Sequence, residues 1–447
     1  MIFFRVTQNI NIKTTDGTLV NYHRFKTPSN LENDTVYITS ENDFNDLKNV
    51  FRNVDKNKYQ IKLLKENKIR ELESFPIELG ISNKNEYLKS LDFKKNTEKK
   101  LTINKNEILS LFDESNKVDI FAQLIKKHGD EISIAIIGGV GRNISEIVSS
   151  CTALRILNNK LKELYKNIKI DIYIDASNNS FYSRDKEIYL KQKFINNVFP
   201  LSITSKKFCS YDYFIDNSSV MEKLSVFNNL NIVDSWLYKF GIDYKTISPF
   251  DKYNELEIKN LIVSKNLEEK IKSSKLKGKL LLFHPFSARI NKTIPKNIAF
   301  VMLKKLLSKM DDYTIISTLN IGSEIVDDRF VNLSKDSKTI NDFIYIISNM
   351  DAIITTDTST FHISDAFMIP TIVLSTDTKI HSKVEYYNYV KTIKIIDKSK
   401  SLSKFIYDNN SLTLYRYKSW QSLKVSKIIK LLDTFWYNRV FICKLRI

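Results

Sequence analysis

The sequence has few glycines, few cysteines and no long apolar run. Only nine of its 447 residues are glycine, which excludes collagen-like and glycine-repeat chains. The three cysteines, Cys151, Cys209 and Cys443, are too few and too scattered for a disulfide framework or a structural zinc site, and they fit a reducing compartment. No segment approaches the ~18 consecutive apolar residues that a membrane-spanning helix needs. The N-terminus lacks the basic region and cleavage site of a signal peptide, so we expect a cytoplasmic protein.

The composition combines a large apolar fraction with a strongly basic charge. Hydrophobic residues make up 43% and aromatic residues 12%, enough for real cores, so wholesale disorder is excluded. The formal net charge is +18, carried mostly by lysines spread along the whole chain. Nucleic-acid readers favour arginine, whose planar guanidinium bonds bidentately, so we expect no nucleic-acid partner. Attraction to an anionic membrane or to acidic glycans is the alternative interpretation of this charge.

Residues 1–128 carry no chemical motif, and we expect them to form an accessory domain of unknown role. At roughly 150 residues per domain, the length of the chain predicts about three domains. Alternating apolar residues predict a strand over Thr35–Thr39. Helical spacing predicts helices over Asn45–Arg52 and Lys105–Phe112.

From residue 129 onward, strands and helices alternate, which predicts an α/β fold with a parallel sheet. The apolar strand Ile132–Ile137 ends in the glycine-rich turn Gly138–Gly141, and a helix with one apolar face follows. This turn does not form the G-x-G-x-x-G fingerprint, which argues against a dinucleotide-dependent dehydrogenase. We expect a polar helix over Arg184–Asn196 and a lysine-rich linker over Lys265–Lys279. The alternation assigns residues 129–275 to a first Rossmann-like domain.

The same alternation restarts over residues 276–395 and predicts a second Rossmann-like domain. Its expected strands are Leu280–Phe283, Tyr313–Ser317, Phe330–Leu333, Ala352–Thr355 and Thr371–Leu374, and its expected helices are Pro295–Met310, Ile340–Met350 and Thr358–Phe367. A cleft between two such domains is a natural ligand site, because strand C-termini and helix N-termini face it.

Two segments of the second domain carry the strongest chemical signal, His284–Pro295 and Asp351–Pro370. Each follows or contains a buried strand and opens a helix, whose N-terminal N–H groups and partial positive charge suit a diphosphate. Hydroxyl groups and the cation of Lys292 would add to such a site. Asp357-Thr358-Ser359 alone would also serve as an ordinary helix N-cap. Two of the five histidines fall inside these segments, and this concentration favours a phosphate-ligand site.

The second segment resembles the D-T-G-x-x-H-x-x-A-A-x-x-x-P motif of the heptosyltransferase-like glycosyltransferases, glycosyltransferase family nine. Its matching residues, in order and spacing, are Asp357, Thr358, His362, Ala366 and Pro370. Ser359 stands where the family has glycine, and Asp365 stands where it has the first alanine of the pair.

The first segment resembles the H-P-x-x-x…K-x-W-P motif of the same family. Its matching residues are His284, Pro285, Ser287, Lys292 and Pro295. Ile294 replaces the usual tryptophan. The resemblance covers roughly residues 130–395 and leaves the N-terminal region and the last fifty residues unexplained.

The resemblance implies the GT-B fold, in which two Rossmann-like domains face a cleft. It implies that the C-terminal half binds a nucleotide-diphosphate sugar and the N-terminal half an acceptor. By resemblance, Ser287 and Lys292 would contact the donor phosphates and Asp357 the sugar. Thr358, Ser359 and His362 would lie at the diphosphate. Transfer would proceed with inversion and without metal or other cofactor, because helix dipoles and lysine neutralise the leaving diphosphate; the sequence contains no Asp-x-Asp triplet.

The catalytic base is expected in the loop after the first strand of the N-terminal Rossmann-like domain, where the family has a Gly-Asp pair. Counting back from Ala153-Leu154 places Ser145-Glu146 there, so Glu146 is the candidate that deprotonates the acceptor hydroxyl. The alternative is that Glu146 only stabilises the first turn of a helix. Asp175 is a second candidate base, because it ends the next strand at the same edge of the sheet.

Residues 396–447 form a basic and aromatic C-terminal segment with a predicted helix. Its apolar residues with helical spacing are Val425, Ile428, Ile429, Leu432, Phe435 and Trp436. Two interpretations stay open: a terminal helix docked on the second domain, and a helix on the inner face of the cytoplasmic membrane that meets lipid-linked acceptors.

The sequence therefore predicts a glycosyltransferase that moves a heptose or hexose from a nucleotide-diphosphate sugar to a bacterial surface glycan. Lipopolysaccharide core biosynthesis is the first expectation for the acceptor. One alternative is a protein glycosyltransferase acting on a surface adhesin. Another is a catalytically inactive protein of the same fold with a binding or scaffold role, which the departures at Glu146, Ile294 and Ser359 would favour.

Overall fold

The computed structural model divides the chain into two compact units, Met1–Lys252 and Tyr253–Ile447. The structure describes residues 1–26, 30–54, 61–81, 120–126, 129–177, 179–218, 220–223, 226–259, 261–322, 325–377, 379–396 and 420–442. The helix predicted over Lys105–Phe112, residues 397–419 and Cys443 lie outside these residues. Within the described ranges, no helix has the combination of length and apolarity needed to cross a membrane.

The first unit contains a five-stranded parallel sheet in the order β6-β11-β7-β8-β9. Its strands are β6 (Ile77–Glu78), β7 (Glu131–Ile137), β8 (Asn167–Ile174), β9 (Ile195–Pro200) and β11 (Tyr213–Asp216). The chain runs from β7 outward through β8 to β9 and then returns to place β11 on the other side of β7. The sheet thus reverses its strand order between β7 and β11, and a crevice at such a switch point is the usual ligand site of an open α/β sheet.

Helix α6 (Ile144–Lys162) connects β7 to β8, helix α7 (Tyr182–Leu190) connects β8 to β9, and helix α11 (Ile232–Lys239) follows β11. Helix α6 begins at the N-cap Asn143, and most of its residues from Ile147 to Leu161 are buried. The helix predicted over Arg184–Asn196 is wrong in its second half. Helix α7 ends at Leu190 and the chain re-enters the sheet at Ile195, because Ile195 and Val198 supply apolar side chains that the edge strand buries.

The N-terminal segment forms a four-stranded antiparallel sheet in the order β10-β4-β1-β5, with helix α1 (Glu41–Val54) and the hairpin β2–β3. The strands are β1 (Ile2–Val6), β2 (Ile10–Lys13), β3 (Leu19–Tyr22), β4 (Tyr37–Thr39), β5 (Ile61–Leu63) and β10 (Ile203–Thr204). The strand predicted over Thr35–Thr39 is confirmed as β4, and the helix predicted over Asn45–Arg52 is confirmed as α1. Helix α1 extends beyond the predicted helix at both ends.

The N-terminal segment and the first Rossmann-like domain are joined by strand exchange in both directions. Strand β6 precedes residue 128 but pairs with β11 in the parallel sheet, whereas β10 follows it but pairs with β4 in the antiparallel sheet. One apolar core also contains side chains from both regions, among them Phe3, Ile38, Ile137 and Phe214. Residues on the two sides of position 128 therefore belong to one compact unit.

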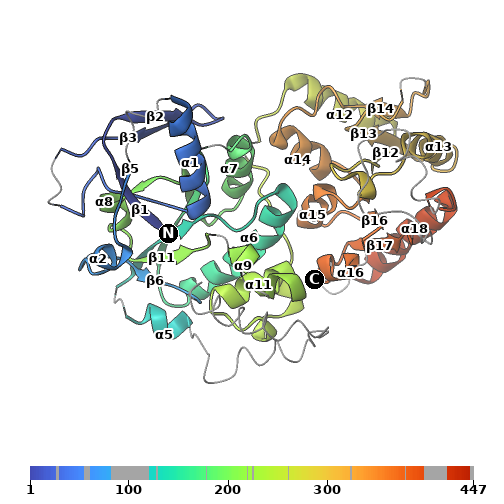
Figure 1. The fold of residues 1–447 in the computed structure, drawn as a ribbon. Coiled ribbons are helices and arrows are strands. Elements are labelled where there is room, and N and C mark those ends of the chain that lie inside the picture. Colours follow the sequence, from blue (N-terminus) through green and yellow to red (C-terminus); the bar gives the residue numbers. More distant parts are fainter. Residues whose placement is uncertain are drawn as a thin grey trace, which may run out of the picture. The chain divides into compact units, whose positions relative to one another are not determined.

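The second unit contains a six-stranded parallel sheet in the order β14-β13-β12-β15-β16-β17 (Figure 1). Its strands are β12 (Lys279–His284), β13 (Tyr313–Ser317), β14 (Phe330–Asn332), β15 (Ala352–Thr356), β16 (Thr371–Ser375) and β17 (Val390–Lys394). Its helices include α13 (Lys296–Leu307), α14 (Ile340–Ser348) and α15 (Ser359–Ala366). The predicted α/β class with two Rossmann-like domains is confirmed, since each unit carries its own parallel sheet with connecting helices.

The lysine-rich stretch expected to be a linker is instead helix α12 (Lys265–Lys277), so this prediction is wrong. Leu267 and Ile271 lie one turn apart and are buried, while the lysines cover the opposite, solvated face. Ser264 caps the start of the helix, and the chain leaves it at Gly278 with a φ of 155°. The many lysines made the amphipathic pattern of this segment hard to recognise in the sequence, although its buried apolar residues pack the helix against the unit.

Helix α18 (Val425–Ile442) packs on the core of the second unit. Its buried side chains include Val425, Ile428 and Leu432, and they lie in one cluster with residues of α13 and the sheet. The docked-helix interpretation of the C-terminal segment is therefore confirmed for the part of it that the structure describes. These buried side chains are therefore not available for a membrane surface.

Candidate functional site

The loops of the second unit that follow β12, β15 and β16 meet at one edge of the sheet. These three strands are parallel neighbours, so their carboxyl ends lie side by side. The loop after β12 carries Lys292 in a 3-10 turn, Ile290–Lys292, and Asp357 follows β15 directly. Lys383 ends the short helix α16 (Ile380–Lys383) after β16. The topology thus brings side chains from three distant segments together.

Two lysines share one carboxylate in this cluster. The Nζ atom of Lys292 lies 2.5 Å from Oδ2 of Asp357, and Nζ of Lys383 lies 3.0 Å from the same oxygen. Lys383 also bonds Oδ2 of Asp377 at 2.8 Å. We call Lys292, Asp357, Asp377 and Lys383 the lysine–aspartate cluster. It holds two ammonium groups and two carboxylates, and a phosphate could replace a carboxylate as the partner of the lysines.

The protonation of this cluster follows from burial and from its ion pairs. Burial disfavours the charge on Asp357, but Lys383 and Lys292 outweigh it and hold the pKa of this carboxyl below its usual value. Burial lowers the pKa of Lys292, although Asp357 opposes the shift. Burial also opposes the charge of Lys383, but Asp357 and Asp377 outweigh it and raise the pKa of this lysine. Asp357 and Lys383 therefore stay ionised at neutral pH.

Helix α15 begins beside Asp357. Thr358 is its N-cap, and Oγ1 of Thr358 accepts a hydrogen bond from the backbone N–H of Thr360 at 3.3 Å. Ser359 is the first helical residue and is half-buried, as is Thr358. The capping interpretation of this sequence is confirmed, and the same N-terminus still offers backbone N–H groups and a partial positive charge to an anion.

The two motif histidines are buried and neutral. Burial lowers the pKa of His362 to about 3 and that of His284 to about 4. Nδ1 of His362 lies 2.7 Å from the hydroxyl of Tyr387, and Nδ1 of His284 lies 3.0 Å from the hydroxyl of Thr318. These histidines add no positive charge at pH 7, so the cationic charge of this region comes from the lysines.

Ser287 holds the shape of the loop after β12. Its backbone N–H donates to Oγ1 of Thr293 at 3.0 Å, and that hydroxyl donates to the carbonyl of Ser287 at 2.9 Å. Ile294, which replaces the tryptophan of the family motif, is buried in the core of the unit. The substitution keeps an apolar anchor at the end of the loop that carries Lys292.

Asp365, the departure from the alanine of the family motif, has a structural role. Its carboxylate accepts a hydrogen bond from the backbone N–H of Asn254 at 3.1 Å. The side chain of Asn254 in turn donates to the carbonyl of His362 at 3.2 Å. Asp365 therefore ties the start of the second unit to helix α15.

In the first unit, Glu146 lies in the first turn of α6 and folds back on the preceding loop. Its carboxylate accepts a hydrogen bond from the backbone N–H of Arg142 at 2.9 Å. Its own backbone N–H donates to Oδ1 of the N-cap Asn143 at 3.1 Å. This reciprocal arrangement closes the start of the helix in the manner of a capping box.

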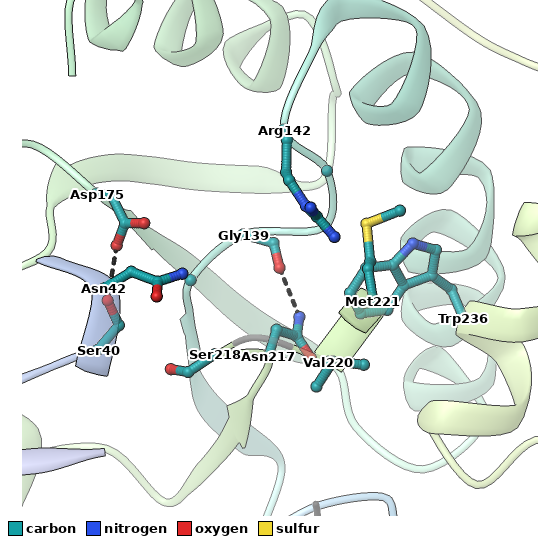
Figure 2. Close-up of a pocket in the computed structure, with 12 residues that line it drawn as sticks. Ser40, Asn42, Gly139, Arg142, Asp175, Asn217, Ser218, Val220, Met221 and Trp236 are labelled. Carbon is teal, nitrogen blue, oxygen red and sulfur yellow. Dashed lines mark hydrogen bonds between the residues drawn. The ribbon is translucent and has the colours of Figure 1, made fainter. Parts of the chain in front are cut away.

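A pocket lies at the switch point of the first sheet, at the carboxyl ends of β7, β8 and β11 (Figure 2). We call it the switch-point pocket. Its lining residues are Ser40, Asn42, Gly138, Gly139, Gly141, Arg142, Asp175, Asn217, Ser218, Val220, Met221 and Trp236. Asp175, the second candidate base, is one of them, and Glu146 is not.

The glycine-rich turn after β7 is required by the geometry of this pocket. Gly138 and Gly139 have φ values of 87° and 66°, which favour glycine. A Cβ atom on Gly139 would lie 2.6 Å from the hydroxyl of Tyr189. That hydroxyl accepts a hydrogen bond from the backbone N–H of Val140 at 2.8 Å, which fixes the turn. The glycine-rich turn therefore forms part of the pocket wall in a fixed conformation.

Sequence reasoning missed Lys383 and most of the pocket-lining residues. Lys383 follows a predicted strand at the edge that carries Asp357, so the placement argument used for Lys292 could have found it. Asn217 and Ser218 likewise follow strand β11 directly. Ser40 and Asn42 come from the N-terminal segment, and no signal in the sequence connects them to this sheet.

The chain was compared with protein-family models, curated proteins and solved structures. No protein-family model matches the sequence, and no curated protein is similar to it. Among solved structures, the ADP-heptose lipopolysaccharide heptosyltransferase II of E. coli is similar over 69% of this chain and 99% of that chain, with 11% identity and a TM-score of 0.49. A glycosyltransferase of family nine from Veillonella parvula is similar over 69% and 98%, with 11% identity and a TM-score of 0.46.

The iron-containing dodecameric glycosyltransferase TibC from enterotoxigenic E. coli is similar over 70% of this chain and 78% of that chain, with 10% identity and a TM-score of 0.40. These solved structures include heptosyltransferases and a member of glycosyltransferase family nine, which is the family that the two sequence motifs resemble.

Proposed function

We propose that the protein is a glycosyltransferase that takes a sugar from a nucleotide-diphosphate donor and passes it to an acceptor hydroxyl with inversion. The second unit would hold the donor, and the first unit would hold the acceptor. The observation that carries the proposal is the lysine–aspartate cluster, where Lys292 and Lys383 converge beside the N-terminus of α15. Two cations and a helix N-terminus at one edge of a parallel sheet suit a diphosphate.

The donor part of the site acts on the leaving group. As the bond between the anomeric carbon and the diphosphate oxygen breaks, its electron pair passes to the diphosphate. Lys292 and Lys383 would stabilise this developing charge, together with the N–H groups at the start of α15. Thr358 and Ser359 add hydroxyl groups at the same helix end, and Asp357 would be released to a sugar hydroxyl when phosphate takes its place.

The acceptor part of the site needs a carboxylate that takes the proton from the attacking hydroxyl. That hydroxyl oxygen forms the new bond to the anomeric carbon on the face opposite the leaving diphosphate. Asp175 lines the switch-point pocket, whereas the carboxylate of Glu146 bonds the backbone N–H of Arg142 at the start of α6. We therefore assign the base role to Asp175 and a helix-capping role to Glu146.

A thermal-shift screen with ADP-, UDP- and GDP-sugars tests the proposal on the whole chain. A donor present at 100 times its Kd stabilises the folded protein by ~2.7 kcal/mol. Transfer is then assayed with the donor that stabilises the protein, and the released nucleoside diphosphate is measured. Failure of every nucleotide sugar to bind would refute the donor site.

The finer choices are those of the sugar and the acceptor. We propose a heptose or a hexose as the sugar and a bacterial surface glycan, such as the core of lipopolysaccharide, as the acceptor. A surface adhesin is the alternative acceptor. Neighbouring genes separate the two, because glycan-synthesis neighbours favour the first and an adhesin neighbour favours the second.

A binding or scaffold role is a second candidate, because Asp357 already pairs with both lysines. In that case a nucleotide sugar would bind without being consumed. Measurement of donor hydrolysis over many hours separates the two functions, since an active transferase consumes some donor even without acceptor.

A further inference from the structure

The N-terminal segment reaches into the switch-point pocket through the start of helix α1. Ser40 stands at the N-cap position of this helix, since its hydroxyl accepts a hydrogen bond from the backbone N–H of Asp43 at 3.0 Å. The same hydroxyl donates its proton to Oδ1 of Asp175 at 2.9 Å (Figure 2). The single proton of this hydroxyl is therefore directed at Asp175. The contact orients the Asp175 carboxylate from a residue that lies outside the Rossmann-like domain.

Asp43 fixes the backbone that follows Asp175. Its buried carboxylate accepts hydrogen bonds from the backbone N–H of Ala176 at 3.1 Å and of Ser177 at 2.9 Å. It also accepts from the hydroxyls of Ser177 and Thr39, both at 3.1 Å. The start of helix α1 thus fixes the loop after β8 at two points. Ser40 bonds the side chain of Asp175, and Asp43 bonds the backbone of the next two residues.

Asn217 and Trp236 of the pocket wall each bury a polar atom that has no hydrogen-bond partner among the described residues. These atoms are the carbonyl oxygen of the Asn217 side chain and the indole N–H of Trp236, whose residues are 5% and 1% exposed. The amide nitrogen of Asn217 donates to the carbonyl of Gly139 at 2.7 Å. A rotation of the amide that gave its oxygen another partner would break this hydrogen bond. One unmatched acceptor and one unmatched donor in the same pocket are the complement of hydroxyl groups, which both donate and accept.

The side chains beside these two atoms are small or flexible. Figure 2 shows Met221 next to the indole of Trp236 and Val220 next to the side chain of Asn217. Methionine has three rotatable bonds, so a rotation of Met221 would open the indole N–H to a ligand. The remaining lining is mostly neutral and polar, with one carboxylate, Asp175, and one guanidinium, Arg142.

We propose that the switch-point pocket binds a neutral sugar ring of the acceptor, and that the N-terminal segment completes this site by positioning Asp175 through Ser40 and Asp43. The proposal rests on the proposed function and names its acceptor class. A pyranose presents several adjacent hydroxyls, which match the hydroxyl, amide and indole groups of the wall. A serine or threonine of a peptide presents one hydroxyl and would leave the other groups unmatched. The lining carries one carboxylate, Asp175, and one guanidinium, Arg142, so it has no net charge that would select an ionic ligand.

The reaction assigned to this site balances without a further reactant. The sugar hydroxyl gives its proton to Asp175, and its oxygen forms the bond to the anomeric carbon of the donor. The bond from that carbon to the diphosphate breaks, and the diphosphate takes the electron pair. Ser40 and Asp43 touch neither reactant and act as positioning residues.

The first experiment measures sugar binding to the whole chain without donor. Methyl glycosides of glucose, galactose, mannose and N-acetylglucosamine are tested by saturation-transfer NMR. We expect at least one to bind, and we expect its signal to fall severalfold in Trp236→Phe, which keeps a ring and removes the N–H. No binding by any glycoside, or binding only by a serine-containing peptide used as a parallel probe, would overturn the sugar assignment.

The second experiment measures transfer to the glycoside that binds. In Ser40→Gly we expect kcat to fall by about 10- to 100-fold, the cost of a misplaced catalytic group, with the affinity for nucleoside diphosphate unchanged. Glycine is tolerated at an N-cap, so helix α1 stays folded. Ser40→Thr keeps the hydroxyl and should restore most of kcat. Ser74→Ala, an exposed serine of the same segment outside the pocket, is the matched control and should match the wild type.

The two proposals fail in different ways. If glycosides bind and no nucleotide sugar does, the proposed function fails and the sugar pocket stands. If donor binds and transfer occurs but Ser40→Gly turns over like the wild type, the positioning role is refuted while the proposed function stands. Asp43→Asn should lower kcat in the same way as Ser40→Gly, because the amide cannot accept all four hydrogen bonds that the carboxylate receives.

Discussion

At the scale of single residues, the lysine–aspartate cluster shows how one carboxylate can hold a site ready for an anion. Asp357 pairs with Lys292 and Lys383, so neither cation is left without a partner at this edge of the sheet. A diphosphate that binds here would replace the carboxylate of Asp357 as the partner of the two lysines.

Replacement of either lysine should weaken donor binding. We expect Lys292→Ala and Lys383→Ala each to cost ~1.5–3 kcal/mol of binding free energy for the nucleoside diphosphate, the range for a charge-assisted hydrogen bond. Isothermal titration calorimetry measures the change. Lys305→Ala, an exposed lysine of α13, is the control and should bind like the wild type. Unchanged affinity in both cluster variants would remove them from the donor site.

The base assignment is tested by two isosteric changes. Asp175→Asn should lower turnover by about 10²–10⁴-fold, because an amide cannot accept the proton. Glu146→Gln should keep near-normal turnover and lose only a few tenths of a kcal/mol in stability, since Glu146 closes the start of α6. Steady-state kinetics at saturating donor decides between them. A large loss in Glu146→Gln together with normal turnover in Asp175→Asn would return the base role to Glu146.

The buried histidines predict a loss of stability in acid. Both have a folded-state pKa below the unfolded value near 6.5, so the unfolded chain binds more protons once the pH falls through that value. Between pH 7 and pH 5, each histidine should cost about 2 kcal/mol of unfolding free energy. Urea unfolding at the two pH values measures the loss.

The control for this prediction is the pair of variants His284→Asn and His362→Gln, compared with the wild type at each pH. Carboxylates contribute equally to wild type and variant, so the difference isolates each imidazole. A difference that stays the same at pH 5 and pH 7 would show that burial does not hold these histidines neutral.

At the scale of elements, helix α18 is an integral part of the second unit. Leu432 and Ile428 are fully buried against the sheet and α13, and Trp420 precedes them in the same core. The basic face of the helix points away from this core. The described apolar residues with helical spacing in α18 are those that pack in the core, and Lys427 and Lys430 of the helix are exposed to solvent.

We expect Leu432→Ala to lower the unfolding free energy by about 2–5 kcal/mol, the cost of a cavity in a core. Lys430→Ala, on the exposed face of the same helix, should change it by less than about 0.5 kcal/mol. Chemical denaturation monitored by tryptophan fluorescence compares the two variants. Equal effects from both would mean that the helix does not contribute to the core in solution.

At the scale of the whole molecule, the chain consists of two α/β units and an N-terminal segment woven into the first of them. The exchange of β6 and β10 makes the N-terminal segment inseparable from the first Rossmann-like domain. The net charge of +18 adds a long-range attraction for anionic donors and for anionic surfaces. The whole chain is therefore the smallest form in which the proposed chemistry can be tested.

Transfer should survive an excess of EDTA, because the proposal gives charge neutralisation to Lys292, Lys383 and the start of α15. The rate of nucleoside diphosphate release is measured with and without the chelator, and we expect the two rates to agree within error. Loss of activity that Mg²⁺ or Mn²⁺ restores would contradict this assignment.

The sequence by itself determined the α/β class, most strand positions and the loops after β12 and β15 that carry Lys292 and Asp357. These follow from local patterns: apolar runs of strand length, helix caps such as Thr358, and motif spacing within single loops. The helix at α12 escaped because its few apolar residues were hidden among lysines. Local patterns report which residues a helix or strand buries, and they report nothing about which segments meet.

Only the tertiary structure decided the partners at the two sites. Lys383 reaches Asp357 because β15 and β16 are neighbours in the sheet, and Ser40 reaches Asp175 because β10 pairs with β4 across about 165 residues of chain. The same contacts separate Asp175, which lines the pocket, from Glu146, which caps a helix. Such contacts depend on strand order and strand exchange, which are set by the packing of the whole core.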